Sequence, residues 1–202
     1  MAKNTVLTLA KQASEGKKVT MVTSYDYTMA SIVEAAGINM ILVGDSLGMT
    51  MLGNEGRCNA VKLEGGVRCA PQIKAIVEAG IPVVGHVGMT PQSANSFGGF
   101  KVQGKSAENA QRIVDDALAV EAAGAFAVVL ECVPSDLAEF ITSKLTHCFT
   151  IGIGAGSACD GQVLVAQDLL GMTPGGFKPK FVRQFAQVGN AMRDAYQAYA
   201  NA

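Results

Sequence analysis

The chain has 202 residues, of which 49% are hydrophobic, and this size and composition predict one globular domain over residues 1–202. A net charge of −1, scattered basic residues and the lack of tryptophan argue against binding to nucleic acid or to an anionic membrane surface. No apolar run reaches the roughly 18 residues of a membrane span, and the short apolar patch near the N-terminus lacks the core of a signal peptide.

Strand and helix signals alternate along the chain. The predicted strands are short runs rich in Val, Ile and Leu, as expected when both faces of a parallel sheet are covered. They span residues 18–26, 38–46, 59–66, 81–88, 126–132 and 149–156, which gives six strands, or seven if one escapes the pattern. Helices are predicted at 27–37, 67–80, 106–124, 134–145, near 160–171 and from about Phe181. Repeated βα units of this kind predict a parallel sheet or a barrel.

One interval breaks the alternation. Only about a dozen residues separate the strand ending near Asp45 from the strand starting near Asn59, and they are rich in glycine without a helical period. A parallel crossover needs at least that many residues and usually contains a helix. Because a closed (β/α)8 barrel typically has about 250 residues, the pattern predicts an α/β fold of TIM-barrel type that lacks one to two βα units.

Three of the apolar runs end in an acid, at Asp45, Glu64 and Glu131. The carboxyl ends of parallel strands form the rim of an active site, so the repeated acids predict a shared metal or acid/base site. Lys62 lies two residues before Glu64 and therefore on the same face of its strand. A cation beside carboxylates suits a carboxylate-bearing substrate held on Mg²⁺, with Asp45 and Glu64 as candidate ligands. The alternative is an ion pair of Lys62 with a carboxylate and a loop cap.

Glu131 follows four apolar residues, and a carboxylate in apolar surroundings has a raised pKa that suits a general base. The alternative is a glutamate that has left the core and caps the helix starting near Pro134. His86 is the one histidine in a predicted strand, and such a residue more often supports its neighbours than binds a metal. The glycines at 151–156 lack the GxGxxG spacing and indicate close backbone packing. The turns at 98–104 form either a mobile lid or an ordinary surface loop.

Longer motifs narrow the function: VTSYDYTMA, ILVGDSLGMT, AVKLEGG, GIPVVGHVGMTPQS, GGFKVQG, DALAVEAAGAFAVVLECVP and CDGQVLVAQDLLG. These stretches cover nearly the whole chain and resemble, in the same order, those of the ketopantoate hydroxymethyltransferase family. The resemblance implies a (β/α)8 barrel that transfers a hydroxymethyl group from 5,10-methylenetetrahydrofolate to 3-methyl-2-oxobutanoate. The product would be 2-dehydropantoate, on the route to pantothenate and coenzyme A.

The resemblance also implies roles for single residues. Asp45 matches a Mg²⁺ ligand that also contacts the substrate, and Ser46 matches a contact to the substrate carboxylate. Lys62 resembles the substrate-binding lysine and Glu64 the metal-site glutamate. Glu131 resembles the base that removes the C3 proton, giving an enolate that Mg²⁺ stabilises. A homo-oligomer, a decamer in the family, is implied as well. The five cysteines, odd in number and without CxxC spacing, predict reduced thiols in a cytoplasmic protein.

The chain departs from the family pattern after residue 53. Family members carry there a helix, a strand and another helix, and the strand ends in an aspartate that also binds the metal. Two hypotheses follow, an active hydroxymethyltransferase that uses the remaining residues, and a catalytically impaired remnant that is at most a structural subunit of the homo-oligomer. A relative acting on another 2-oxo acid is a third reading, which the substrate-contact motifs disfavour.

Overall fold

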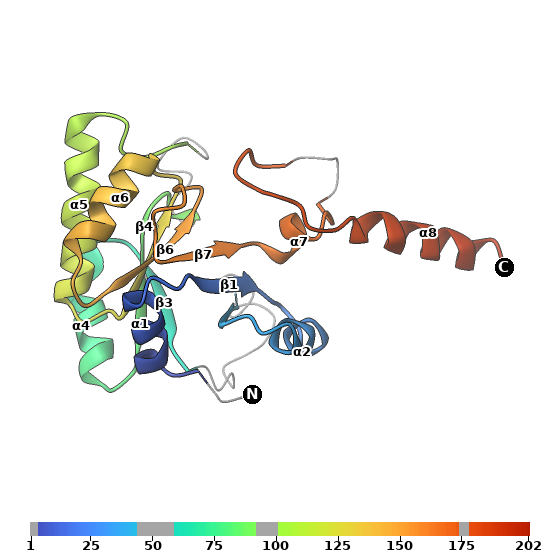
Figure 1. Cartoon of the computed structure of the whole chain (residues 1–202), viewed down its shortest axis with the longest axis horizontal. Helices are drawn as coiled ribbons and strands as arrows, with labels where there is room; N and C mark the ends of the chain where they lie inside the picture. The colour runs from blue at the N-terminus through green and yellow to red at the C-terminus, as the bar shows by residue number, and fades with distance from the viewer. Residues whose placement is uncertain (1–3, 44–58, 92–100, 174–177) are drawn as a thin grey trace.

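The computed structural model describes residues 4–43, 59–91, 101–173 and 178–202 (Figure 1). Within them, seven strands form one parallel sheet in the order β2-β1-β7-β6-β5-β4-β3. The strands are β1 (Val19–Thr23), β2 (Met40–Leu42), β3 (Val61–Glu64), β4 (Val83–Gly88), β5 (Ala127–Glu131), β6 (Phe149–Ile153) and β7 (Gly161–Leu164). The helices are α1 (Val6–Ser14), α2 (Tyr27–Ala35), the 3₁₀-helix η1 (Val67–Cys69), α4 (Ala70–Glu78), α5 (Ala107–Ala122), α6 (Ser135–Lys144), α7 (Ala166–Leu169) and α8 (Val188–Ala200).

The six predicted strands are confirmed, and the seventh lies where a helix was expected. Residues 160–171 begin with β7, which pairs with β1 on one side and β6 on the other, and only α7 is helical. The apolar spacing of this stretch fits a helix, but its first residues pair as a strand and bury Val163 in a core cluster. The prediction of one helix over this stretch was therefore wrong.

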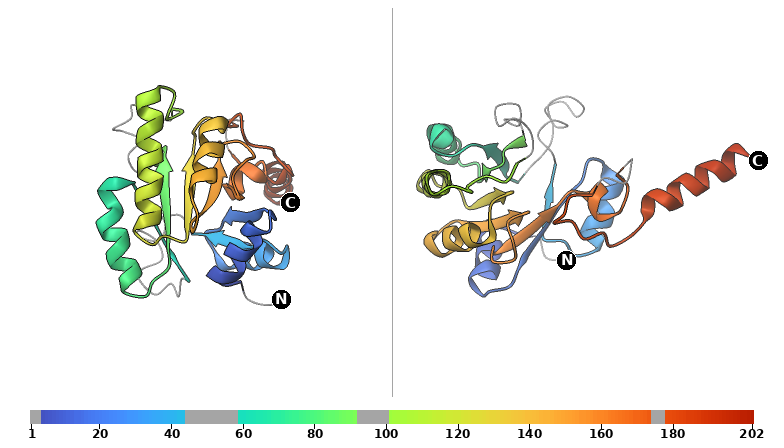
Figure 2. Two further views of the ribbon diagram at one scale, coloured as in Figure 1. Left: turned by 60° about the vertical axis from the view of Figure 1, so that its left-hand side comes forward. Right: turned by 90° about the horizontal axis from the view of Figure 1, so that it is seen from above.

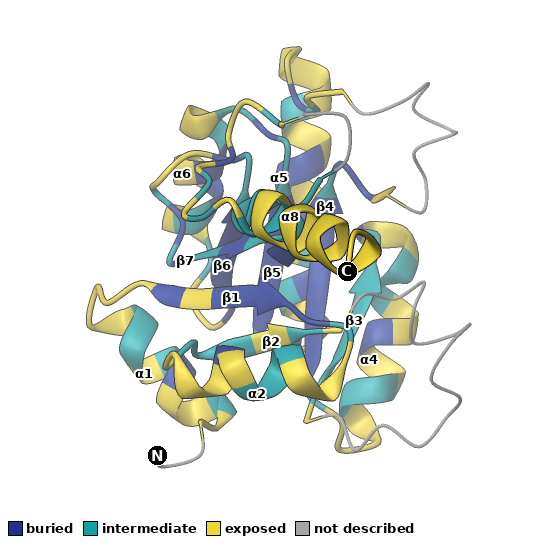
Figure 3. Cartoon of the chain, turned by 90° about the vertical axis from the view of Figure 1, so that its right-hand side faces the viewer, coloured by how far each residue is buried: buried dark blue, intermediate teal, exposed yellow. Residues whose placement is uncertain are grey.

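The two ends of the chain also differ from the sequence pattern. Helix α1 was not predicted, and it starts with a capping box between Thr5 and Thr8. The last helix begins at Val188 rather than near Phe181. The preceding segment donates backbone N–H groups to α7 instead of to its own turn, from Phe185 to Leu169 O and from Val188 to Leu170 O. Helix α8 then extends away from the sheet (Figure 1), and none of its residues is buried (Figure 3).

The two faces of the sheet pack against different partners. Helices α4, α5 and α6 cover the outer face (Figure 2), and the outer core lies between them and the strands. The strand residues in this outer core include Val83, Val87, Val128 and Leu130. The inner face of the curled sheet holds a second cluster, which includes Met21, Val84, Val129, Ile151 and Val163. Both faces of the sheet therefore carry apolar side chains, as is typical of parallel strands.

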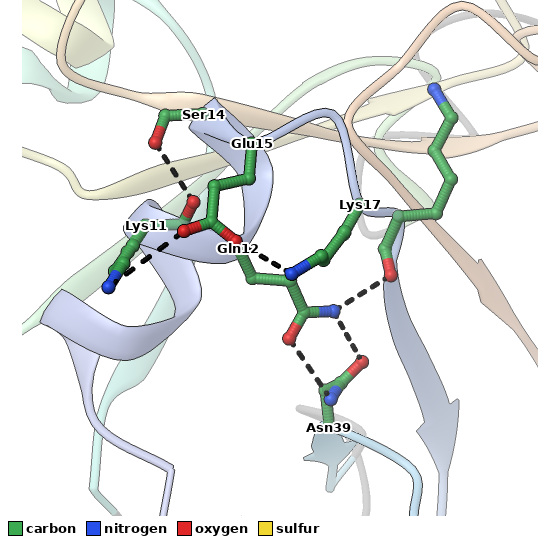
Figure 4. A network of polar contacts seen from close by, with 7 residues as sticks. Lys11, Gln12, Ser14, Glu15, Lys17 and Asn39 are labelled. Atoms are coloured by element: carbon green, nitrogen blue, oxygen red, sulfur yellow. Dashed lines mark hydrogen bonds and ion pairs between the residues drawn. The ribbon is translucent and has the colours of Figure 1, made fainter.

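Helix α1 covers the amino-terminal side of this inner cluster, where it buries Leu9. Polar contacts hold it to the neighbouring strands (Figure 4). Gln12 Nε2 donates to Lys18 O at 2.9 Å and to Asn39 Oδ1 at 3.2 Å. Asn39 Oδ1 also accepts from the backbone N–H of Thr20 at 2.9 Å. These bonds tie α1 to the starts of β1 and β2.

The sheet has the strand order of a barrel that is open at one place. Strands β2 and β3 follow each other along the described chain, yet they form the opposite edges of the sheet. In the residues that the structure describes, no pairing joins them. The fold is therefore α/β and barrel-like with units missing, as the sequence predicted. None of the described helices is long and apolar enough to cross a membrane.

Close packing of α5 on β4 depends on a glycine and can be tested by mutation. A Cβ atom at Gly85 would lie 2.3 Å from Val120 Cγ1, so Gly85→Ala should lower the free energy of unfolding by about 1–3 kcal/mol. Val120→Ala alone should cost about 2 kcal/mol because it leaves a cavity. The double variant should lose less stability than the sum of the two single losses, because the smaller side chain in Val120→Ala leaves room for the new Cβ atom at position 85. Urea denaturation of the four proteins measures this coupling, and strict additivity would refute the contact.

Candidate active site

Strand register brings four polar side chains together on the inner face of the sheet. Along β4 and β5, Val84 and Val129 belong to the inner cluster, so alternation places His86 and Glu131 on the same face. Val61 and Leu63 of β3 pack against the outer core, which leaves Lys62 and Glu64 facing inward. Glu64 stands opposite His86 in the register, and Glu131 stands opposite Gly88.

These four residues, Lys62, Glu64, His86 and Glu131, form what we call the inner-face network. Glu64 Oε1 lies 3.1 Å from Lys62 Nζ and 3.3 Å from His86 Nδ1. On the other side of the imidazole, His86 Nε2 lies 3.1 Å from Glu131 Oε2. The side chains are 4–14% exposed, so the network is largely withdrawn from water.

The network favours a charged imidazole between two carboxylates. Burial alone would lower the pKa of His86, but Glu131 and Glu64 outweigh it and raise that pKa above its usual 6.5. Burial alone would likewise raise the pKa of Glu64, but His86 and Lys62 together lower it to about 2. His86 Nε2 is close enough to Glu131 for charge attraction, although its N–H does not point at the carboxylate as a hydrogen bond requires. This atom therefore keeps hydrogen-bonding capacity.

The structure tests part of the sequence prediction. Lys62 and Glu64 share a face, as predicted, and they also form the ion pair that was the alternative reading. Glu131 faces the inner side of the sheet and does not cap α6, whose first turn has no side-chain cap. Its surroundings are not purely apolar, however, because His86 lies beside it. Asp45 and Ser46 lie outside the described residues.

The sequence prediction missed how central His86 is. Spacing along the strand puts His86 on the same face as Val84, but only the structure shows that this is the inner face. The glycines at 151–156 do pack closely, as expected: a Cβ atom at Gly156 would lie 2.7 Å from Ser135 Cβ. Of the proposed lid at 98–104, the structure describes residues 101–104. Gly104 packs there against Leu137.

The donor set bears on whether Mg²⁺ fits this site. In the described part of the chain, no three His, Cys, Asp or Glu side chains form a cluster that could hold a metal by themselves. Mg²⁺ needs only one or two carboxylates, because it keeps waters and binds substrate oxygens. Glu64 is an oxygen donor whose low pKa keeps it ionised at neutral pH. It therefore fits Mg²⁺ as one ligand.

Comparison with known proteins identifies close relatives. The family model of ketopantoate hydroxymethyltransferase matches residues 3–57 and 52–202, two stretches that meet where the alternation of strands and helices breaks. Proteins named 3-methyl-2-oxobutanoate hydroxymethyltransferase are 47% identical in Clostridium botulinum and Clostridium novyi and 44% identical in Enterococcus faecalis. Each alignment spans 249 residues and covers 98% of this chain and 90% of the relative, so about fifty positions of the relatives have no counterpart in the 202 residues.

Among solved structures, phosphonopyruvate hydrolase is similar with a TM-score of 0.44 and 14% sequence identity, over 100% of this chain and 85% of that one. A structure titled native KDPGal has a TM-score of 0.40 and 15% identity, over 98% of this chain and 92% of that one.

The charge of His86 can be measured directly. In metal-free protein, its imidazole should titrate above pH 6.5, because the two carboxylates favour the charged form. The stability that this protonation contributes is fully present below pH 6.5 and is lost as the pH rises through the folded-state pKa. Glu131→Gln should lower the pKa of His86, since it removes one of the two negative neighbours. NMR titration of the ring nitrogens, with His147→Gln to assign the two histidines, gives both values. A pKa below 6.5 would contradict the network.

Proposed function

The chain belongs to the ketopantoate hydroxymethyltransferase family, and we propose that it transfers a hydroxymethyl group from 5,10-methylenetetrahydrofolate to 3-methyl-2-oxobutanoate. The product would be 2-dehydropantoate, in the pathway to pantothenate. The observation that supports this most is the inner-face network at the carboxyl ends of β3, β4 and β5. The ammonium group of Lys62 and the carboxylates of Glu64 and Glu131 lie close together there, an arrangement that suits substrate binding, metal binding and proton removal.

Substrate binding would use Lys62. Its ammonium group is a compact charge at the end of a flexible stem, and it reaches the inner face beside Glu64. An incoming 2-oxo acid carries a carboxylate that can accept hydrogen bonds from this group. The family resemblance adds Ser46 as a further contact to the substrate carboxylate and Asp45 as a metal ligand that also contacts the substrate.

Glu64, together with Asp45, would hold Mg²⁺. The bound ion would polarise the keto and carboxylate oxygens of the substrate and make the C3 proton more acidic. The protein itself would contribute by keeping the Glu64 carboxylate ionised and directed to the inner face of the sheet. Lys62 and His86 do this by contacting the same oxygen, Oε1.

Glu131 would take the C3 proton. It is 14% exposed and stands at the last position of β5, so it borders the inner space without being sealed inside it. His86 Nε2 lies 3.1 Å from this carboxylate on one side. When Glu131 becomes protonated, His86 still has Glu64 at 3.3 Å, so the buried cation is not left without a counter-charge. The resulting enolate carbon would then bond to the methylene carbon of 5,10-methylenetetrahydrofolate, whose two bonds to nitrogen break as tetrahydrofolate leaves and one water supplies the hydroxyl oxygen.

A second candidate function follows from the missing residues. About fifty positions of the relatives are absent, and the two matched stretches meet at residues 52–57. The family resemblance puts a further metal-binding aspartate in the absent segment. Loss of that ligand would weaken Mg²⁺ binding, and the chain would then act at most as a structural subunit of a cytoplasmic homo-oligomer, which in the family is a decamer.

Proton exchange separates the two candidates. Solvent exchange at C3 of 3-methyl-2-oxobutanoate in D₂O, followed by NMR, needs the metal and the base but no folate. With Mg²⁺ we expect exchange, and Glu131→Gln should slow it at least about a hundredfold. Glu139→Gln, on the exposed side of α6, is the matched control and should not change it. A folded wild-type protein without exchange would support the remnant, and exchange that survives Glu131→Gln would exclude this residue as the base.

Lys62→Gln tests the substrate contact. Removing the charge should raise KM for the 2-oxo acid at least about tenfold, because a charge-assisted hydrogen bond to the carboxylate is lost. The control is Lys74→Gln, a lysine that is 67% exposed and pairs with Glu78 on α4. Its KM should equal that of the wild type. An unchanged KM in Lys62→Gln would show that the substrate carboxylate does not bind to Lys62.

A further inference from the structure

The residue after Glu131 has an unusual backbone. Cys132 has φ 50°, and among the described residues it is the one non-glycine with a positive φ. The left-handed region carries a steric penalty for residues with a Cβ atom. Such outliers persist where the surrounding structure enforces them, and they concentrate at functional sites.

Three backbone hydrogen bonds enforce this conformation. The carbonyl of Glu131 accepts from Met89 N at 2.8 Å, just after β4. The N–H of Cys132 donates to Ile153 O at 2.9 Å, at the end of β6, and its carbonyl accepts from Gln103 N at 2.8 Å. The peptide groups on both sides of Cys132 are thereby fixed to neighbouring elements.

The turn at Cys132 decides what lies next to Glu131. In a continuous strand, Val133 would share the inner face with Glu131. Instead Val133 is 2% exposed and belongs to the outer core. It packs over Gly88, where a Cβ atom would lie 2.9 Å from Val133 Cγ1 and 2.4 Å from Glu131 O. The reversal therefore makes Glu131 the last inward-facing residue of its strand, with its carboxylate against His86.

We propose that Cys132 is a positioning residue for Glu131, acting through its left-handed backbone and not through its thiol. Its importance for catalysis rests on the proposed role of Glu131 as the base. The thiol is half-buried, and burial together with the charge of Glu131 raises the pKa of Cys132, so a reactive thiolate is disfavoured.

Three substitutions at this position separate backbone from thiol. Glycine adopts a positive φ without penalty, serine keeps the size of the side chain but lacks sulfur, and valine is β-branched and disfavours the left-handed region. The first readout is the chemical shift of the His86 ring nitrogens at one fixed pH in metal-free protein, because Glu131 lies 3.1 Å from Nε2. Glu131→Gln supplies the shift expected when that carboxylate is lost.

We expect Cys132→Gly and Cys132→Ser to keep the wild-type ring shifts, and Cys132→Val to move them toward those of Glu131→Gln. In the exchange assay, Cys132→Val should lower kcat on the order of tenfold with KM unchanged, because a displaced base affects the proton-transfer step rather than substrate binding. A global loss of structure would instead weaken the folded-state signals of the His86 ring and the exchange activity together.

Wild-type ring shifts in Cys132→Val would overturn the proposal, and so would equal displacement in Cys132→Gly and Cys132→Ser, which would assign the role to the thiol. If Cys132→Val does not fold, the glycine and serine variants still decide whether the thiol is needed, and displaced ring shifts in both would overturn the proposal. The ring shifts do not depend on turnover. A wild-type protein without exchange would therefore count against the proposed function while the positioning of Glu131 is still tested.

Discussion

A buried imidazole between two glutamates is the interaction on which the candidate site depends. His86 is 3% exposed, and a charge so far from water is costly unless opposite charges lie beside it. Glu64 and Glu131 supply those charges from the two strands on either side of β4. His86, together with Lys62, in turn lowers the pKa of Glu64 and so keeps that carboxylate ionised. The three residues are therefore electrostatically coupled, and a change in one alters the other two.

The inner-face network lies on strands that pair in a chain lacking about fifty positions of its relatives. Lys62, Glu64, His86 and Glu131 all stand on three adjacent strands, β3, β4 and β5, that pair in continuous register. The break lies between β2 and β3, at the edges of the sheet. Neighbouring parallel strands stabilise one another locally, so a missing strand at an edge leaves the pairing of the others intact. Asp45 and Ser46 belong to the interval of the chain between these two strands and lie outside the described residues.

The backbone around the site has its own constraints. Gly88 allows the end of β4 to approach the carbonyl of Glu131, and Cys132 turns the chain outward directly after it. Both features lie at strand ends. Because the chain turns outward after Cys132, Val133 packs in the outer core and Glu131 is the last side chain of its strand to face inward. The contacts that aim Glu131 thus come from the backbone of three neighbouring elements, while those that set its charge environment come from His86.

The sequence by itself determined the parallel α/β fold, the six strands built from apolar runs, and the shared face of Lys62 and Glu64. These follow from local periodicity, which needs no knowledge of distant residues. Strand β7 and the late start of α8 depended on tertiary contacts, because β7 pairs with β1 and β6, and Phe185 and Val188 donate to the end of α7. The sequence placed Glu131 after an apolar run, but only the structure showed His86 beside it. Which strands are neighbours, and in which register, is set by pairing across the sheet, and no spacing along the chain encodes that a histidine of β4 lies between acids of β3 and β5.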